Sequence, residues 1–259
     1  MKALVVSVSA DEVEVASDAL WGLGVVAVEE RAAGEWVELW TSLGDHPGEV
    51  DLPWPWRFEE VDERVADTWR EHAEPTEVEP GLVVRPAWVP FAAPPGSTVL
   101  HIEPGATFGM GDHPTTVLCL RAARRLVSPG CTVLDVGCGS GVLAVAAMVF
   151  GAGRAEGVDI APAAVPVTLA NAAANEVEVA VSTTDLADVS NTFDIVLANI
   201  LAPTLVALAP DLKRVLAPGG RMVVSGILAD AHQHVLDALA PLQVERVETL
   251  DGWAAVTLR

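Results

Sequence analysis

The stretch Val133–Gly141, VLDVGCGSG, decides the fold of this chain of 259 residues. It is an apolar strand that carries the acid Asp135 near its end and then passes through closely spaced glycines, among them Gly137 and Gly139. Such a turn lets a ligand approach the backbone without meeting a Cβ atom. A second apolar run, AEGVD, ends in Asp159. The two runs together predict a site for a nucleotide-type cofactor at the ends of neighbouring strands.

The spacing of the glycines distinguishes between cofactors. A dinucleotide fingerprint, Gly-x-Gly-x-x-Gly, would place its third glycine at position 142, where this chain has Val142. The pattern here is D-x-G-x-G-x-G, which resembles motif I of the Rossmann-like S-adenosylmethionine methyltransferases. That cofactor has no pyrophosphate, so the glycines would allow close approach of its methionine part, and Asp159 is placed to accept both ribose hydroxyls. A Gly-rich turn in another doubly wound domain is the alternative that this motif alone leaves open.

Charge narrows the choice of partner. The formal net charge of −21 argues against direct binding of nucleic acid, which requires clustered Lys and Arg. Residues 1–60 contain 13 acidic and 3 basic side chains, a net charge of −10 in the first quarter of the chain. A basic protein is the partner that this charge favours, and general solubility is the alternative explanation.

Other features bear on the compartment. Cys119, Cys131 and Cys138 form no C-x-x-C pair and predict reduced thiols rather than disulfides or zinc ligands. The sequence has no uninterrupted run of about 18 apolar residues, so we expect no membrane span. The N-terminus acquires acids at Asp11 and Glu12 and reads as a first strand rather than a signal peptide. We expect a cytoplasmic monomer without a bound metal.

Three parts follow one another along the chain. Residues 1–60 predict a small acidic α+β, ferredoxin-like domain whose core is filled by large rings, with Trp36, Trp40, Trp54 and Trp56 as the candidates. Residues 61–95 predict a helix, from Asp62 to about Ala73, and then an irregular Pro-rich connector with short extended pieces. Residues 96–259 predict the cofactor-binding domain.

The pattern of residues 96–259 alternates between strands and helices, which predicts a doubly wound, mostly parallel sheet of seven strands. Asp251-Gly252 separates the last two apolar runs and is a hairpin signal, so the last strand should be antiparallel. Pro162 and Pro166 both fall in the third helix pattern of this domain. Because an interior proline costs about 3 kcal/mol, the regular helix is expected to begin at Pro166.

Two further segments carry candidate site residues. The loop EPGATFGMGDHPTT, residues 103–116, surrounds Phe108 with glycines and leads into a helix start with hydroxyls such as that of Thr116. This composition suits a flap over a flat ring and a polar ligand at a helix start, and His113 is expected to be structural. FDIVLANIL, residues 193–201, ends a strand beside the glycine turn, where Asn199 could accept from an amine and donate to the cofactor. A cap is the commoner role of such an Asn.

In this order, EPGATFGMGDHPTTVLCL, VLDVGCGSGVLAVAA, GVDIAP, NAAAN, FDIVLANIL and PGGRMVVSGIL resemble the PrmA family, the methyltransferases of large-subunit ribosomal protein L-eleven. The resemblance covers the chain from about residue 66 to the end, and its loop, P-G…F-G-x-G-x-H-P-T-T, is specific to that family. It implies a class I Rossmann-like fold and methyl transfer from S-adenosylmethionine to lysine side-chain and N-terminal amines. It also implies that the small N-terminal domain recognises the protein substrate.

By position, the resemblance implies cofactor contacts at Thr116, Gly137, Asp159 and Asn199, with Phe108 as a flap contact, and the motif itself adds Asp135 and Gly139. Asn199 would also orient the reacting amine and is the one catalytic residue expected. The loop departs from the family pattern at Thr107 and Met110, which leaves the substrate and the number of methyl groups open. The alternatives are a methyltransferase of another protein or of a small molecule on the same fold, and a non-catalytic cofactor-binding module for ribosome assembly.

Overall fold

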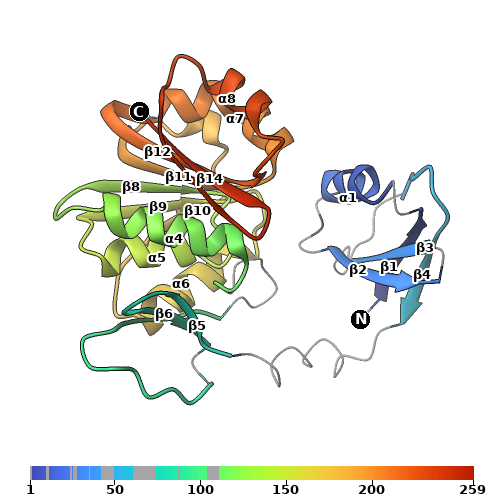
Figure 1. Ribbon diagram of the computed structural model, residues 1–259, viewed down its shortest axis with the longest axis horizontal. Helices are drawn as coiled ribbons and strands as arrows, with labels where there is room; N and C mark the ends of the chain where they lie inside the picture. The colour runs from blue at the N-terminus through green and yellow to red at the C-terminus, as the bar shows by residue number, and fades with distance from the viewer. Residues whose placement is uncertain are drawn as a thin grey trace. The chain divides into compact units, whose positions relative to one another are not determined.

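The computed structural model describes residues 2–9, 12–23, 25, 28–34, 36–41, 50–60, 74–86, 88–103 and 111–259. The chain forms two compact units, Met1–Ala73 and Glu74–Arg259, and Figure 1 traces each of them by colour. The helix predicted from Asp62 to about Ala73 lies outside the described residues, as does Phe108.

The N-terminal unit is a small α+β module. Its antiparallel sheet has the order β2-β3-β1-β4. The strands are β1 (Lys2–Val8), β2 (Val28–Ala33), β3 (Trp36–Thr41) and β4 (Trp56–Glu60), and the helix α1 (Val13–Gly22) follows β1. This arrangement confirms the predicted α+β module.

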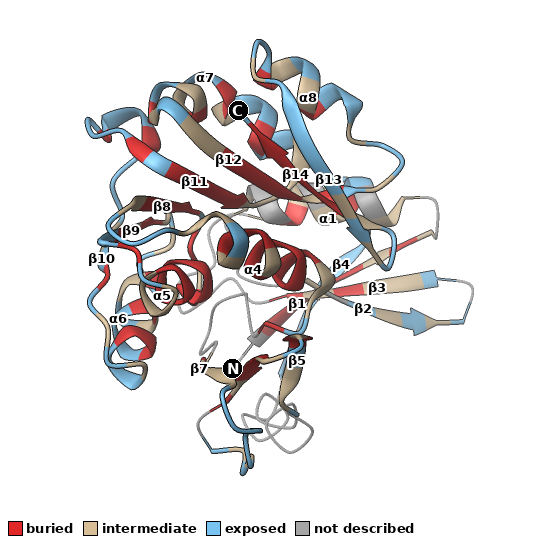
Figure 2. Ribbon diagram, turned by 60° about the vertical axis from the view of Figure 1, so that its left-hand side comes forward, coloured by how far each residue is buried: buried red, intermediate tan, exposed pale blue. Residues whose placement is uncertain are grey.

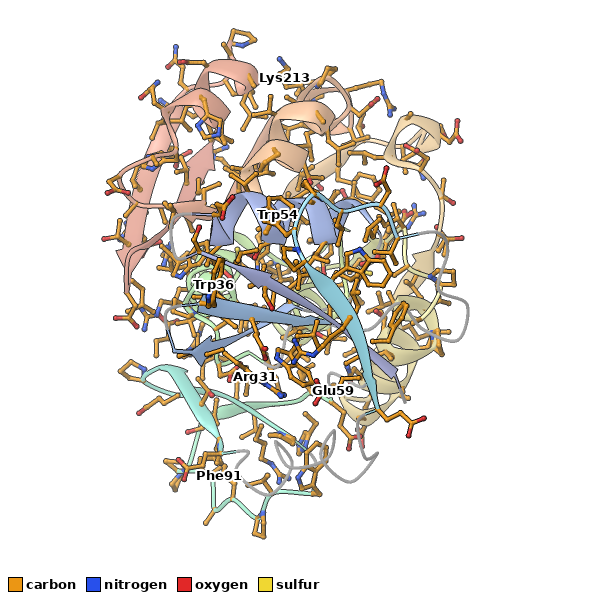
Figure 3. The ribbon with its side chains drawn as sticks, turned by 90° about the vertical axis from the view of Figure 1, so that its right-hand side faces the viewer. Arg31, Trp36, Trp54, Glu59, Phe91 and Lys213 are labelled. Atoms are coloured by element: carbon orange, nitrogen blue, oxygen red, sulfur yellow. The ribbon has the colours of Figure 1, made fainter. Side chains whose placement is uncertain are left out.

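One face of this sheet packs on α1 and buries aliphatic side chains such as Leu4, Val6 and Leu39. Trp54 borders this cluster and its indole N–H donates to Glu12, 3.2 Å away; Figure 3 labels it beside α1. Other rings lie outside the core, so the prediction that the tryptophans fill it is wrong for most of them.

Trp36 and Trp56 are 55% and 41% exposed. Trp40 lies on the face of the sheet away from α1, with the guanidinium of Arg31 4.0 Å from its ring centroid. Strand alternation decides this outcome, because Leu39 takes the inward position and its neighbour Trp40 must face outward.

The C-terminal unit begins with a small sheet in the order β5-β6-β7. Its strands are β5 (Thr76–Glu79), β6 (Leu82–Arg85) and β7 (Thr98–His101). Residues 76–85 therefore form a hairpin within the C-terminal unit, where the sequence predicted an irregular connector with short extended pieces. Pro80 and Gly81 make its turn, with Gly81 at φ +80°, so the proline removes no hydrogen bond from the ladder.

The main sheet has the strand order β10-β9-β8-β11-β12-β14-β13. Its strands are β8 (Thr132–Val136), β9 (Arg154–Val158), β10 (Ala180–Ser182), β11 (Phe193–Asn199), β12 (Leu216–Leu228), β13 (Val244–Leu250) and β14 (Trp253–Leu258). Pairs from β10 through β12 are parallel, and β14 is antiparallel to both of its neighbours. The predicted mostly parallel seven-stranded sheet with an antiparallel last strand is confirmed. Asp251 and Gly252 make the last hairpin at φ +48° and +81°.

Helices cover both faces of the main sheet (Figure 1). One face carries α4 (Pro114–Leu126), α5 (Val142–Val149) and α6 (Ala164–Ala174), and the other carries α7 (Ala202–Arg214) and α8 (Gln233–Leu239). The short 3-10 helix η1 (Leu186–Asp188) follows β10.

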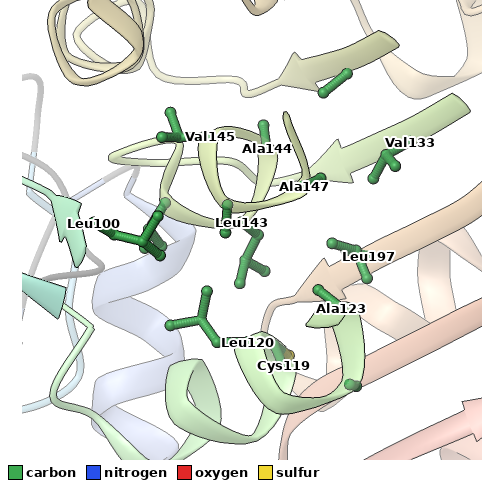
Figure 4. Packing of buried hydrophobic residues seen from close by; sticks show 14 of the residues in the cluster. Leu100, Cys119, Leu120, Ala123, Val133, Leu143, Ala144, Val145, Ala147 and Leu197 are labelled. Carbon is green, nitrogen blue, oxygen red and sulfur yellow. The ribbon is translucent and has the colours of Figure 1, made fainter. Parts of the chain in front are cut away.

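Each face of the main sheet has its own buried cluster, and Figure 2 shows the buried strands and helix faces in red. On β11, Leu197 faces α4 and α5 while its neighbour Val196 faces the opposite cluster. Figure 4 shows Leu197 and Val133 opposite Leu143 of α5 and Leu120 of α4. Alternation along the buried strands therefore builds two cores, while the parallel pairing of β9, β8 and β11 places their carboxyl ends side by side.

Helix α6 begins at Ala164, two residues before the predicted start. Pro166 lies in the first turn, where a missing backbone N–H costs no helical hydrogen bond. Among the described residues, no helix has the length and apolar character needed to cross a membrane.

Candidate active site

The glycine turn, residues 137–141, follows β8 at the carboxyl edge of the main sheet. Gly137 and Gly139 lie at φ +70° and +53°, in the left-handed region that favours glycine. A Cβ atom on Gly137 would lie 2.4 Å from Cγ2 of Ile200, so the close approach of the segment after β11 also requires glycine. The amide of Gly137 donates to the carbonyl oxygen of Val158, 2.8 Å away, and ties the turn to the end of β9.

Asp159 directly follows β9 and contacts the turn. Its Oδ2 accepts from the amide of Gly139 and its Oδ1 from the amide of Ala161, both at 2.8 Å. Each carboxylate oxygen has a second lone pair, so both oxygens can still accept from a pair of hydroxyls. The structure thus brings Gly139 and Asp159 together and fixes the orientation of the carboxylate.

Asp135 lies beneath the turn and is only 1% exposed. Its Oδ2 accepts from the amide of Ala144 in the first turn of α5, 3.1 Å away, and so satisfies one of the donors that a helix start leaves unpaired. Burial, and to a smaller extent the charge of Asp159, raise the pKa of Asp135 to about 7, although the Ala144 hydrogen bond acts in the opposite direction. The side chain that the sequence predicted as a cofactor contact therefore also joins strand to helix.

Asn199 ends β11, on the other side of β8 from Asp159. Its Nδ2 donates to Oγ1 of Thr116, 3.3 Å away, and Thr116 is fully buried in the first turn of α4. The sequence predicted both residues as cofactor contacts, and the structure brings them together across 83 positions of the chain. Because the amide donates through Nδ2, its Oδ1 can accept from an incoming N–H.

His113 is a structural residue, as predicted. It is the N-cap of α4, its Nδ1 accepts from the amide of Thr115, and its ring meets Trp253 edge-on at 5.2 Å between centroids. Burial lowers the pKa of His113, so the ring is neutral at pH 7 and can keep accepting at Nδ1.

Two features of the site did not follow from the sequence. Ile160, the residue after Asp159, is 88% exposed, and a large apolar side chain in such a place is suited to a flat ligand ring. The sequence did contain a signal for Ile160, because a residue that directly follows a strand-end acid lies at the carboxyl edge of the sheet. Thr168 and Asn171 of α6 donate hydrogen bonds to carbonyl groups of the glycine turn. Only these contacts in the folded chain identify them as part of the site.

Cys138 lies within the glycine turn and is buried. Burial, together with the charge of Asp135, raises the pKa of this thiol and keeps it protonated. In the described part of the chain, no group of three or more His, Cys, Asp or Glu side chains is arranged to hold a metal ion.

A parallel sheet of this strand order, its antiparallel last strand and a glycine turn with an acid at the end of the next strand define the Rossmann-like fold of class I S-adenosylmethionine-dependent methyltransferases. Within that class, residues 55–259 match the model of one family, ribosomal protein L11 methyltransferase (PrmA), and the chain belongs to this family. The resemblance predicted from the sequence motifs is therefore confirmed.

Individual relatives agree with this assignment. The ribosomal protein L11 methyltransferase of Geobacter metallireducens is 47% identical over 184 residues, which cover 71% of this chain and 61% of that protein. The protein of the same name from Geobacter sulfurreducens is 42% identical over 88% of this chain and 77% of its own length. A crystal structure of the ribosomal protein L11 methylase of Lactobacillus delbrueckii subsp. bulgaricus aligns with a TM-score of 0.67 at 31% identity, covering 71% of this chain and 97% of that one.

Proposed function

We propose that this protein transfers methyl groups from S-adenosylmethionine to lysine side-chain and N-terminal amines of ribosomal protein L11. One observation carries the proposal. In a chain of this family, Asp159, the glycine turn and Asn199 lie at the carboxyl ends of three neighbouring parallel strands, β9, β8 and β11. Ligands of open α/β sheets bind at this edge.

The residues at the edge fit the parts of that cofactor. The carboxylate of Asp159 suits the two ribose hydroxyls, and the exposed side chain of Ile160 suits the adenine face. Gly137 and Gly139 would admit the methionine part, with Asp135 behind them, and Thr116 with Asn199 would hold its other side. When bound, S-adenosylmethionine supplies an electrophilic methyl group on a positively charged sulfur.

The substrate amine must be neutral to react, and a free lysine with a pKa of about 10.4 is almost wholly protonated at pH 7. Desolvation at the site and the nearby positive charge both lower the pKa of the amine, so water can take the proton without a strong general base. Oδ1 of Asn199 would accept from the amine and align its lone pair with the methyl group. Positioning is then the main catalytic effect.

The N-terminal residues have a separate role in this proposal. Residues 1–60 dock the protein substrate, and the unit Glu74–Arg259, which includes the hairpin of β5 and β6, carries out methyl transfer. The net charge of −10 on residues 1–60 supports docking of a basic protein, because opposite charge accelerates association and favours the correct partner.

The test is methylation of purified L11 from the same organism with radiolabelled S-adenosylmethionine, followed by mass spectrometry to locate the methyl groups. Asn199→Ala should lower kcat by at least about 100-fold, because it removes the group that orients the amine. Asn191→Ala is the matched control, since Asn191 is an exposed Asn just before the opposite end of β11, and it should leave kcat unchanged.

Each other outcome contradicts a definite part of the proposal. Label on a different protein or small molecule of a cell lysate, with none on L11, would refute the substrate. Methyl groups only on side chains other than amines would refute the chemistry. Binding of the cofactor without labelling of any component would show a non-catalytic module.

A further inference from the structure

Helix α6 presents a row of polar side chains to the glycine turn and to the segment after β7. Thr168, Asn171 and Asn175 are spaced by three and four residues and therefore lie on one face of the helix. Thr168 is fully buried and Asn171 is 2% exposed. Polar groups as deeply buried as these require partners, and the partners identify their role.

Two consecutive carbonyl groups of the turn point at this row. Oγ1 of Thr168 donates to the carbonyl oxygen of Gly139, 3.2 Å away, and Nδ2 of Asn171 donates to that of Ser140, 2.8 Å away. On the other side of the same turn, the amide of Gly139 donates to Asp159. The orientation of the peptide groups in the turn is thus held from both sides.

The turn also packs tightly on the helix. An ideal Cβ on Gly141 would lie 2.5 Å from Cγ2 of Thr168, so the methyl group of Thr168 occupies the space that any larger residue would need. Gly141 itself has φ +75°. The hydroxyl and the methyl group of Thr168 therefore make separate contacts with the same turn, and a substitution can remove either one alone.

Asn171 joins the turn to a second segment. Its Oδ1 accepts from the amide of Glu103 at 2.9 Å, and its Nδ2 donates to the carbonyl oxygen of Glu103 at 2.8 Å. Asn175 binds His101 in the same way, at 2.9 and 2.7 Å, one turn of helix further from the glycine turn. Figure 1 shows α6 between the main sheet and the small sheet that ends in β7.

We propose that Asn171 and Thr168 are positioning residues for the cofactor: they hold the carbonyl groups of the glycine turn inward, so that the turn keeps the shape the cofactor needs. This rests on the proposed function, because the turn matters only if S-adenosylmethionine binds there. The side chain of Asn175 instead bonds to His101 of β7 and to the carbonyl oxygen of Asn171. Its loss should cost stability without changing cofactor affinity.

Isothermal titration calorimetry with S-adenosylhomocysteine tests this on the full chain. Asn171→Ala should weaken binding about tenfold, since three hydrogen bonds at the turn and at Glu103 are lost. Asn175→Ala is the matched control, because its amide also makes three hydrogen bonds from the same helix, and it should change affinity less than about twofold. Melting temperatures are measured for both, and kcat at saturating cofactor should stay close to that of the wild type.

The pair Thr168→Val and Thr168→Ser decides the matter if Asn171→Ala does not fold. Valine keeps the branched shape and removes the hydroxyl, so affinity should fall about fivefold, whereas serine keeps the hydroxyl and should restore most of it. Equal affinities of Asn171→Ala and Asn175→Ala, or of the two Thr168 variants, would overturn the inference. Wild-type protein that binds the probe but does not methylate L11 refutes the proposed function alone, and wild-type protein that does not bind refutes both.

Discussion

The two units of the molecule differ in how far their sequences determine residue roles. In the C-terminal unit, a few motifs place individual side chains: the turn after β8 requires glycine at position 137, and an acid at the end of β9 meets the amide of Gly139. In the N-terminal unit, the strand pattern predicts the elements, yet the charge of residues 1–60 indicates only a class of partner. A motif that the backbone requires identifies individual residues, whereas net charge identifies only the chemical class of a partner.

Surface composition separates the units further. The N-terminal sheet exposes large rings at Trp36, Trp56 and Phe58, and Trp56 and Phe58 meet edge-on at 5.5 Å between centroids. Exposed aromatic side chains are enriched at protein-binding surfaces. The polar groups of the candidate site lie in the C-terminal unit instead, at one edge of its main sheet. The difference supports a division of labour between docking and chemistry.

Deletion of residues 1–73 should have the largest effect. Without a docking unit, kcat/KM for L11 should fall by at least about 1000-fold, because the amine must then find the site without tethering. The affinity for S-adenosylhomocysteine should stay within about threefold, since the polar groups of the site all lie in the other unit.

Both large buried clusters of the C-terminal unit consist of residues from Val78 onward, so the truncated protein should fold, and circular dichroism checks this. Full activity of a folded truncated protein would show that the N-terminal unit does not dock the substrate. A short free peptide carrying an amine serves as the control substrate, and it should be methylated equally by both proteins.

Asp135→Asn tests whether a site residue is also a source of instability. Folding raises the pKa of this carboxyl from 3.8 to about 7, so the folded state disfavours the charged form, and stability is lost as the pH rises from about 4 to about 7. The neutral amide removes this loss. The variant should be more stable than the wild type by at most about 4 kcal/mol at pH 8 and by almost nothing at pH 4.

Denaturant titrations across this pH range measure the difference. Asp194→Asn is a control of opposite sign, because hydrogen bonds from Thr132 lower the pKa of Asp194. That variant should be less stable at pH 7, and its deficit should disappear in acid. An Asp135→Asn protein without any gain at pH 8 would show that the buried carboxyl is stabilised in a way that its single bond to Ala144 does not reveal.

Asp159→Ala should weaken binding of S-adenosylmethionine at least about tenfold, the loss expected for a bidentate contact worth about 1.4 kcal/mol. Asp185→Ala is a close control, because Asp185 also accepts from the amide two residues later, after the neighbouring strand β10. It should leave affinity unchanged. If the two variants bind equally well, Asp159 holds only its own loop and the ribose assignment is wrong.

Much of the fold and part of the site could be predicted from the sequence. The alternation of strands and helices, the hairpin at Asp251-Gly252 and the meeting of Gly139 with Asp159 all follow from local rules about glycine and strand ends. The pairing of Asn199 with Thr116 required the order of strands as well. The alternation, the hairpin and the glycine turn could be predicted because each depends on the backbone geometry of a short segment of sequence.

Long-range packing could not be predicted in the same way. Nothing local in the sequence of β3 distinguishes an outward Trp40 from an inward one, because the register with β1 decides which face each ring takes. The hairpin of residues 76–85 was hidden by its prolines, which lie at its ends and its turn. Asn171 contacts Glu103 and Ser140 across 68 and 31 positions, and only the assembled fold brings these groups together.

The smallest predicted effect concerns salt and separates charge from apolar contact in docking. Raising the ionic strength from 0.05 to 0.5 M shortens the Debye length from more than 10 Å to about 4 Å, so the attraction between the acidic unit and a basic protein is screened. The KM for L11 should rise about threefold to tenfold, while the Kd for S-adenosylhomocysteine should change less than about twofold. Surface plasmon resonance with immobilised L11 should assign most of this loss to the association rate, because steering charges act before contact. The KM could also fail to respond to salt although truncation abolishes methylation. In that case the exposed rings of Trp36, Trp56 and Phe58, rather than the acidic side chains, would recognise the substrate.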